Sequence, residues 1–261
     1  MISSSHNPKI QRVRALLTRR QERENAMAFV VEGVRLVEEA LKSRWQPQLV
    51  LCTRQLSPRG KTLVEKAASQ GIEVEEVLSG VMESISDTET TQGLMAVFSI
   101  QSLPLPRQPD FLLILDNLRD PGNLGALLRS AEAAGVQAVI LSPGTVDAFS
   151  PKVVRSAMGA HFRLPIHSLT WQEIKAFCHG NQSSSLKILV AEGERGMLYW
   201  KFDLHQPLAL VIGGEAQGAS EQAIQYADDL ITIPMPGISE SLNAAVAGSI
   251  LLFEVVRQRY P

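Results

Sequence analysis

The 261-residue chain lacks several features that mark specialised protein classes. Its two cysteines, Cys52 and Cys178, match no metal-binding or redox spacing, so we expect two reduced and mostly buried thiols in a cytoplasmic protein. Uninterrupted apolar runs such as 111–115 are far shorter than the ~20 residues that a membrane span needs. The first residues, MISSSHNPKIQRVR, have no apolar stretch typical of a secretory signal. No membrane partner is expected.

A strong net charge is also missing. The chain has 25 Lys+Arg and 27 Asp+Glu, a formal net charge of −2, which by itself does not favour a nucleic-acid partner. The charges are unevenly distributed, because the first 24 residues contain six cations and two anions. Any contact with a polyanion should therefore begin near the N-terminus.

The composition otherwise resembles that of globular proteins. Apolar residues make up 45% of the chain and charged residues 20%, which excludes wholesale disorder, collagen and coiled coil. The length is typical of one or two domains. The histidines form no cluster with ligand spacing, and no metal is expected; they are His6, His161, His167, His179 and His205.

A proline-rich seam divides the chain. QSLPLPRQPD, residues 101–110, contains three prolines, which fix φ and remove hydrogen-bond donors. We therefore predict one domain over 1–100, a linker over 101–109 and a second domain over 110–261.

Both predicted domains alternate strands with helices. The first has predicted strands at 28–32, 47–52, 72–77 and 93–99 and helices at 8–24, 33–43 and 58–69, typical of a three-layer α/β unit. The second has short, almost wholly apolar strands at 111–116, 137–142, 187–192, 208–213 and 230–235, and a last helix over about 241–257. Such strands indicate a parallel sheet that is buried on both faces.

The first predicted helix has a sharp start and a basic stripe. Asn7 suits the N-cap and Pro8 the first helical position. Five cations fall on one arc of this helix and could follow phosphates, although a solvated helix face would look the same. They are Lys9, Arg12, Arg19, Arg20 and Arg23.

A first group of candidate functional residues lies in the segment LDNLRDPGNLGALLRSAEAAG. This segment starts where a predicted buried strand ends, and it continues into a predicted helix. It therefore lies at the carboxyl edge of the sheet, where open parallel sheets bind ligands. Arg129 points away from the apolar stripe of the helix, with Asn123 at the helix start, so both are available to an anion or are simply solvated.

Two further segments follow buried strands. In LALVIGGEAQGAS, Gly213 and Gly214 permit close ligand approach, and Glu215 lies inside the glycine-rich turn. The spacing matches neither a Rossmann fingerprint nor a P-loop. In the segment 231–259, Ser239 or Ser241 could cap the last helix.

The same segment 231–259 carries a glycine and an amide of interest. Gly248 lies inside the predicted helix, where glycine is less favourable than alanine, so we expect another backbone to approach closely at this position. Asn243, with Ser241, offers polar groups to the same sheet edge.

Taken together, these segments resemble the three signature motifs of the SpoU/TrmH family of RNA ribose 2′-O-methyltransferases in the SPOUT superfamily. The matches are N-x-G-x-x-x-R at Asn123, Gly125 and Arg129, G-x-E-x-x-G at Gly213, Glu215 and Gly218, and I-P-M…S-L-N at 233–235 and 241–243. The segment 150–166 resembles a stretch between the first two motifs. The segment 30–41 is similar to an L30e-like substrate-binding domain.

The resemblance implies an N-terminal L30e-like three-layer α/β domain, and a catalytic α/β domain with a deep trefoil knot. It implies a homodimer that binds S-adenosylmethionine in the knot and methylates a ribose 2′-hydroxyl in RNA, with ribosomal RNA favoured over tRNA. Implied catalytic residues are Asn123, Arg129, Glu215, Ser241 and Asn243. Implied cofactor contacts are Gly193, Ile212, Gly213, Gly214, Ile233, Met235 and Leu242, and Arg155 joins the basic stripe as an RNA contact.

One departure and several alternatives stay open at this point. Gly214 and Ala216 flank the glutamate where many members have Asn and Gly, which leaves the shape of this loop open. Arg129 could act as a base or, because guanidinium is normally locked in its charged form, as an electrostatic stabiliser. A SPOUT enzyme that modifies tRNA or a base, a non-catalytic RNA-binding assembly factor and a nucleotide-dependent oxidoreductase remain alternatives.

Overall fold

The computed structural model describes residues 1–43, 45–180, 185–193, 195–215, 218–238 and 241–260. The chain forms two compact units. Unit 1 contains residues 1–101 together with 149–162, and unit 2 contains 102–148 and the residues from Arg163 onward. The sequence-based division placed 149–162 in the second domain, so the two divisions differ for this segment.

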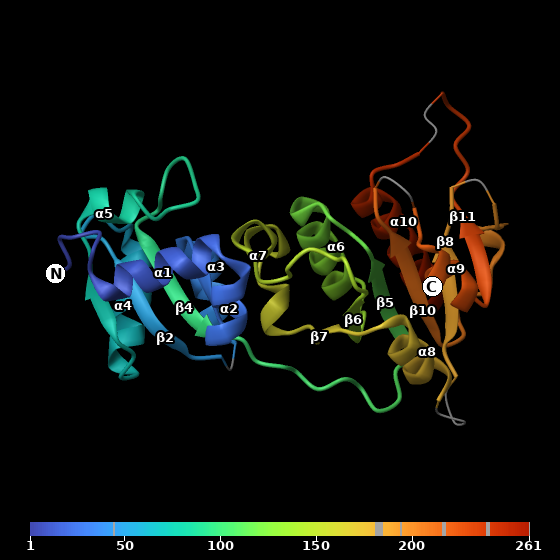
Figure 1. Ribbon diagram of the computed structural model, residues 1–261, viewed down its shortest axis with the longest axis horizontal. Helices are drawn as coiled ribbons and strands as arrows, with labels where there is room; N and C mark the ends of the chain where they lie inside the picture. Colours follow the sequence, from blue (N-terminus) through green and yellow to red (C-terminus); the bar gives the residue numbers. More distant parts are fainter. Residues whose placement is uncertain (44, 181–184, 194, 216–217, 239–240, 261) are drawn as a thin grey trace. The chain divides into compact units, whose positions relative to one another are not determined.

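Unit 1 is built on a four-stranded sheet with the order β1-β4-β2-β3 (Figure 1). The strands are β1 (Ala28–Glu32), β2 (Pro47–Cys52), β3 (Val74–Glu76) and β4 (Leu94–Ser99). β4 pairs antiparallel with both β1 and β2, and β2 pairs parallel with β3. All four strands fall within the ranges that the sequence pattern predicts.

Helices cover both faces of this sheet. They are α1 (Pro8–Thr18), α2 (Arg20–Ala26), α3 (Val34–Lys42), α4 (Pro58–Ser69) and α5 (Ser79–Glu83). The apolar residues of α1 and α5 form one buried cluster with inward residues of β1, β2 and β4. α3 packs against α4 and β4, which makes this the predicted three-layer arrangement.

The segment 149–162 completes an aromatic cluster in unit 1. It contains α7 (Pro151–Ala157) and the 3₁₀ helix η1 (Ala160–Phe162), and α7 packs against β1. The ring of Phe29 lies 5.1 Å from that of Phe149, and Phe162 lies 5.2 Å from Trp45 and 5.4 Å from Phe98. Burial of these rings explains why the segment belongs to unit 1.

The predicted helix 8–24 is in fact two helices. The predicted cap is confirmed, because the Asn7 side chain accepts from the N–H of Lys9, with Pro8 following. The helix ends at Arg19, whose backbone is extended (φ −123°, ψ 119°). The Arg23 guanidinium is buried and donates to the carbonyl of Leu16 at 2.6 Å, which satisfies an orphan acceptor at the end of α1. Arg23 therefore departs from the expected basic stripe.

Unit 2 contains a seven-stranded parallel sheet with the order β7-β6-β5-β10-β8-β11-β9 (Figure 1). The strands are β5 (Phe111–Asp116), β6 (Ala138–Leu141), β7 (Ile166–Ser168), β8 (Lys187–Ala191), β9 (Met197–Leu198), β10 (Leu208–Gly213) and β11 (Asp229–Thr232). All five predicted strands are present, and the predicted α/β class with a mostly parallel sheet is confirmed.

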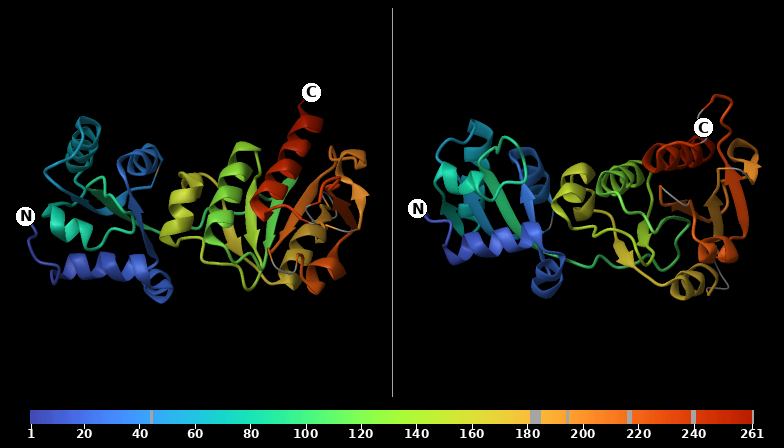
Figure 2. Two further views of the ribbon diagram at one scale, coloured as in Figure 1. Left: turned by 90° about the horizontal axis from the view of Figure 1, so that it is seen from above. Right: turned by 45° about the horizontal axis from the view of Figure 1, so that its top comes forward.

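Helices cover this sheet on both faces (Figure 2). They are α6 (Pro121–Ala133), α8 (Trp171–His179), α9 (Glu221–Tyr226), α10 (Ala244–Arg259) and the 3₁₀ helix η2 (Tyr199–Lys201). α8 and α9 bury one face of β5, β6, β8 and β10. α6 and α10 pack against each other, and α10 also contacts β10.

Gly248 allows α10 to pack closely against α6. A Cβ at this position would lie 2.4 Å from Cδ2 of Leu127 and 3.3 Å from Ile212. The predicted close neighbour is thus a pair of side chains rather than another backbone. The start of α10 also differs from the prediction, because the helix begins at Ala244 with Asn243 as its N-cap. Ser241 precedes this cap, and Ser239 lies outside the described residues.

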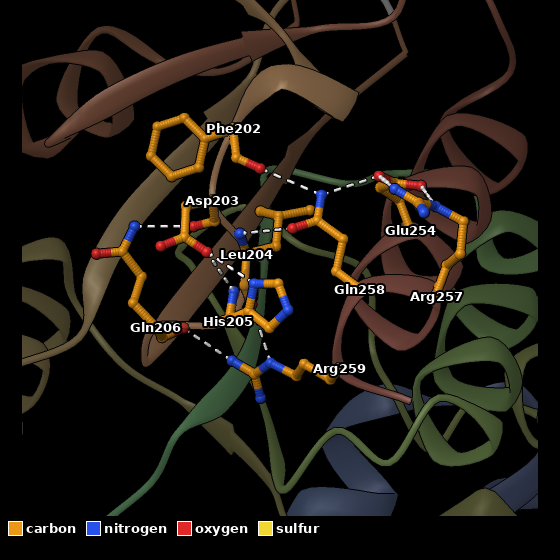
Figure 3. Close-up of polar contacts among 9 residues, drawn as sticks. All are labelled: Phe202, Asp203, Leu204, His205, Gln206, Glu254, Arg257, Gln258 and Arg259. Atoms are coloured by element: carbon orange, nitrogen blue, oxygen red, sulfur yellow. Dashed lines mark hydrogen bonds and ion pairs between the residues drawn. The ribbon is translucent and has the colours of Figure 1, made fainter. Parts of the chain in front are cut away.

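The C-terminal end of α10 is anchored to the segment before β10 (Figure 3). Gln258 accepts from the N–H of Leu204 at 3.0 Å and donates to the carbonyl of Phe202 at 3.1 Å. Arg259 donates to the carbonyls of Leu204 and Gln206 at 3.0 and 2.8 Å. These bonds fix one end of the helix whose other end reaches the carboxyl edge of the sheet.

Candidate functional site

A pocket of about 410 Å³ lies at the carboxyl edge of the parallel sheet in unit 2. Its walls are the ends of β8, β10 and β11, the loop after β11, and the start of α10. The pocket is lined by all seven residues predicted to contact the cofactor: Gly193, Ile212, Gly213, Gly214, Ile233, Met235 and Leu242. Glu215 and Ser241 also line it. Segments distant in the sequence thus converge on one cavity.

Three side chains from the three motifs form one hydrogen-bonded chain at this edge. Asn123, in the first turn of α6, donates through Nδ2 to Oε1 of Glu215 at 2.7 Å. Asn243 donates through Nδ2 to Oδ1 of Asn123 at 2.9 Å. Asn243 also accepts from the N–H groups of Ala245 and Val246, so its orientation is fixed by its role as the N-cap of α10.

The helix that carries Asn123 has an acidic side chain as its N-cap. Asp120 accepts from the N–H of Asn123 at 2.8 Å, and Pro121 occupies the first helical position. Glu215 and Asn243 are exposed and Asn123 is half-buried, so a large substrate can reach this chain of side chains. One Glu215 oxygen and the amides of the asparagines can orient a hydroxyl group there.

Close backbone contacts shape the loop that holds Glu215. A Cβ on Gly213 would lie 2.2 Å from the carbonyl carbon of Gly218, and a Cβ on Gly214 would lie 2.6 Å from the carbonyl oxygen of Asn117. Gly214 and Gly218 also form an isolated antiparallel bridge. Only glycine permits this fold of the loop. Ala216, the departure noted above, lies outside the described residues.

Asp116 is a positioning residue that the sequence analysis missed. Its carboxylate, at the end of β5, is 1% exposed and accepts from the Ser142 hydroxyl at 2.6 Å and from the Trp171 indole N–H at 3.0 Å. It also accepts from the N–H of Ser220 at 2.7 Å, which ties down the loop between β10 and α9. The available signal was an acidic residue at the end of an otherwise apolar strand.

Comparison with known proteins identifies the family. Residues 110–253 match the SpoU rRNA Methylase family, and residues 7–96 match the MRM3-like substrate binding domain. The 23S rRNA (guanosine(2553)-2′-O)-methyltransferase RlmP of Bacillus subtilis is 32% identical, and the alignment covers 97% of this chain and 98% of the relative. The chain belongs to the SpoU rRNA methylase family.

Solved structures agree with this assignment over almost the whole chain. An AdoMet-bound rRNA methyltransferase from Sinorhizobium meliloti has a TM-score of 0.86 at 30% identity and covers 98% of this chain and 97% of its own. The SpoU methyltransferase AviRb from Streptomyces viridochromogenes, in complex with AdoMet, has a TM-score of 0.87 at 29% identity and covers 97% and 99% of the two chains. The predicted family resemblance is confirmed.

In this SpoU family member, Arg129 lies apart from the hydrogen-bonded chain. It is exposed on α6, six residues beyond Asn123, which corresponds to a rise of about 9 Å along the helix. Within the described residues it forms no hydrogen bond or ion pair. Its guanidinium is therefore available to a substrate or to a second copy of the chain.

The predicted RNA contacts are in different environments. The Lys9 ammonium pairs with Glu73 and Glu75, and these hydrogen bonds raise its pKa above the usual value. Arg20 pairs with Glu24 at 2.6 Å, and Arg155 with Asp87 at 2.8 Å. Arg23 is buried, as described above.

Arg12 and Arg19 of the stripe remain exposed and have no carboxylate partner among the described residues. Arg12 donates a hydrogen bond to the Gln48 side chain. The basic stripe is thus narrower than the sequence predicts.

Other features bear on what the protein can bind. In the described part of the chain, no helix has the length and apolar character to cross a membrane, and no three His, Cys, Asp or Glu side chains gather as a metal site would require. Cys52 and Cys178 are both free and buried, as predicted. Burial raises the pKa of the Cys178 thiol to about 12.

Proposed function

We propose that the protein transfers a methyl group from S-adenosylmethionine to a ribose 2′-hydroxyl of 23S-type ribosomal RNA. The observation that carries this proposal is the Asn243–Asn123–Glu215 chain of side chains beside the pocket at the sheet edge. It joins the three motifs of a family whose relatives include enzymes named for 23S rRNA 2′-O-methylation.

The residues of the pocket fit S-adenosylmethionine. Ile212, Ile233, Met235 and Leu242 provide an apolar wall for an adenine ring, and the glycine-rich backbone at 213–214 provides close polar groups. The carboxylate of Glu215 provides negative charge near a sulfonium. When bound, the cofactor supplies an electrophilic methyl group.

The chain's own residues then position the sugar. Glu215 shares one oxygen with Asn123, and its other oxygen is available to accept a hydrogen bond from a ribose hydroxyl. Asn123 and Asn243 hold Glu215 in place through side-chain amides. Arg129 stays charged, binds the adjacent phosphate and stabilises negative charge that develops on the attacking oxygen. Orientation of the hydroxyl is the main contribution of the protein.

A homodimer is part of this proposal. α10 presents Val246 and Phe253 to solvent, 47% and 49% exposed, with the half-buried Ile250 between them on the same helical face. α6, which carries Arg129, packs beside α10, and Ser130 bonds to Ser249 at 2.8 Å. An apolar helix face of this kind favours pairing with a second copy. We propose that Arg129 of one copy completes the site of the other.

The trefoil knot is likewise a proposal, and so is a cytoplasmic location. The knot is supported by the crossing order, in which β10 inserts between β5 and β8 while β11 lies beyond β8, and by the return of α10 to the segment before β10. The location is supported by the two free, buried cysteines.

The decisive experiment compares RNA from a deletion strain with RNA from its parent. We expect one 2′-O-methyl group to disappear from the large-subunit ribosomal RNA and to return when the purified protein and S-adenosylmethionine are added to the isolated RNA. Loss of a base methyl group, loss confined to tRNA, or an unchanged modification pattern would each contradict the proposal.

A further inference from the structure

Glu192 supplies a second carboxylate to the pocket at the sheet edge. It directly follows β8 and lines the same pocket as Glu215, which follows β10. The three signature motifs do not contain Glu192, and the mechanism proposed above gives it no role. Glu192 is half-buried, and a carboxylate that is partly removed from water needs a hydrogen-bond donor or a cation to compensate for the lost hydration.

The backbone at Glu192 is held in place by β11. The N–H of Glu192 donates to the carbonyl of Ile231 at 2.9 Å. The hydroxyl of Thr232, the last residue of β11, donates to the carbonyl of Gly193 at 3.2 Å. The Glu192 side chain therefore extends from a fixed point at the carboxyl edge of the sheet.

The Glu192 carboxylate has open space beside it and no partner in the described part of the chain. Its Oε1 would lie 3.6 Å from a Cβ on Gly218, and no other described atom lies within 4 Å of that position. Gly218 has φ +65°, a conformation that disfavours a side chain, so this space stays open. Arg195 borders a neighbouring cavity together with Glu192, but the two side chains do not pair. A bound ligand can therefore supply the donors that this carboxylate lacks.

The order of the strands assigns the two carboxylates to different parts of the cofactor. β10 lies between β5 and β8, and β11 lies beyond β8. Glu215 bonds to Asn123, in the helix that follows β5, so it lies on the side of the proposed methyl transfer. Ile233 and Met235, after β11, belong to the apolar wall proposed for the adenine. The ribose joins the adenine to the sulfonium, and the strand between these two sides is β8, which Glu192 follows.

We propose that Glu192 accepts hydrogen bonds from the 2′- and 3′-hydroxyls of the cofactor ribose. A carboxylate accepts without donating, and its two oxygens can accept from two neighbouring hydroxyls. An acidic side chain has the same task toward the ribose in dinucleotide-binding α/β folds. Glu192 thus selects ligands with an intact diol, because a ligand without it leaves the carboxylate unpaired. The inference rests on the proposed function and adds a residue that determines cofactor specificity.

Calorimetry with the full chain and three ligands tests this inference. S-adenosylhomocysteine has both the ribose diol and the α-ammonium group, 5′-methylthioadenosine has the diol alone, and 2′-deoxy-5′-methylthioadenosine lacks the 2′-hydroxyl. We expect Glu192→Ala to raise the Kd of the first two ligands by the same factor, about 10–30-fold. Glu192→Gln keeps one acceptor oxygen and should raise it about threefold to fivefold. Loss of the 2′-hydroxyl should weaken binding about tenfold in the wild type and less than about twofold in Glu192→Ala.

The matched control is Glu221→Ala, which removes an exposed carboxylate at the start of α9, outside the cofactor pocket. It should change each Kd less than about twofold. The inference is wrong if Glu192→Ala weakens S-adenosylhomocysteine but not 5′-methylthioadenosine, because the carboxylate then serves the α-ammonium group. It is also wrong if Glu192→Ala binds all three ligands as Glu221→Ala does, or if loss of the 2′-hydroxyl affects Glu192→Ala and the wild type equally. A wild type that binds none of the ligands would instead overturn the proposed function.

Discussion

At the scale of single residues, the proposed site contains two kinds of side chain. Those of the hydrogen-bonded chain are held in place by one another, whereas Arg129 is not. Asn123, Glu215 and Asn243 fix one another through two side-chain bonds of 2.7 and 2.9 Å. Arg129 has no such restraint among the described residues, and its charge is permanent at physiological pH. In the proposed mechanism, the first three therefore position the reacting groups, and Arg129 stabilises charge.

Replacement of Arg129 should separate binding from chemistry. We expect Arg129→Ala to leave S-adenosylmethionine affinity within about twofold of the wild type and to lower the methylation rate by about 10²–10³-fold, because it removes an electrostatic contact to the reacting groups. Calorimetry and single-turnover methylation measure the two quantities. Arg129→Lys, which keeps the charge without the planar fork, should recover only part of the rate. Unchanged activity in Arg129→Ala would remove this residue from the mechanism.

Gly213 should be intolerant of even one added carbon. A Cβ there would meet the backbone of Gly218 and Ala219 at 2.2 and 2.3 Å, and backbone cannot move aside as a side chain can. We expect Gly213→Ala to displace the loop and to weaken S-adenosylmethionine binding at least about tenfold. Gly237→Ala is the control, since no atom lies within 4 Å of a Cβ at that position. Equal affinities in the two variants would show that the loop does not shape the pocket.

At the scale of elements, α10 links the proposed cofactor site to the rest of unit 2. Its N-cap, Asn243, belongs to the hydrogen-bonded chain, and its last turns hold the segment before β10 (Figure 3). Glu254, 8% exposed, accepts two bonds of 2.7 Å from Arg257 and one of 2.9 Å from Gln258. The hydrogen bonds from Arg257 hold the pKa of the Glu254 carboxyl below its usual value.

This carboxylate should make stability depend on pH in the acidic range. Because its pKa is lower in the folded than in the unfolded chain, its contribution is present above the unfolded value of about 4.3 and is lost as pH falls through the folded value. We expect Glu254→Gln to be less stable than the wild type near neutral pH, with the difference shrinking below about pH 4. Urea unfolding at several pH values measures this. A difference that is constant with pH would exclude an ionic contribution.

Secondary structure also shows where sequence patterns fail at this scale. The pattern at 8–24 favours one helix, but the chain breaks at Arg19 so that Arg23 can satisfy the carbonyl of Leu16. Helical periodicity does not record such a tertiary hydrogen bond. Conversely, α8 went unpredicted although Thr170 and Glu173 form a capping box that is legible in the sequence.

At the scale of the whole molecule, the proposed dimer decides whether the reaction centre is complete in one chain. The exposed face of α10 and the position of Arg129 on the neighbouring α6 both favour a site shared between two copies. This arrangement can be tested by complementation, because a shared site is restored when each copy supplies what the other lacks.

Mixed dimers should recover activity from two inactive chains. When Arg129→Ala and Glu215→Ala chains are co-expressed with different tags, we expect up to about a quarter of wild-type methylation, because half of the dimers are mixed and one of their two sites is intact. Each variant alone should be nearly inactive. Recovery that stays at the level of the single variants, in dimers shown to be mixed, would place the whole site within one chain.

Much of this protein is determined by its sequence alone. Apolar runs such as 111–115 and 208–212 indicate buried parallel strands, and Asn7 indicates a helix start, because these signals depend on local geometry and burial. The second and third motifs also contain residues that line the pocket, among them Gly213, Ile233 and Leu242. Only the tertiary structure decided that Asn123 bonds to both Glu215 and Asn243, that Asp116 anchors a loop 104 residues away, and that Arg23 is buried. These contacts join donors and acceptors that are far apart in the sequence, and a local sequence pattern does not specify which distant groups come together.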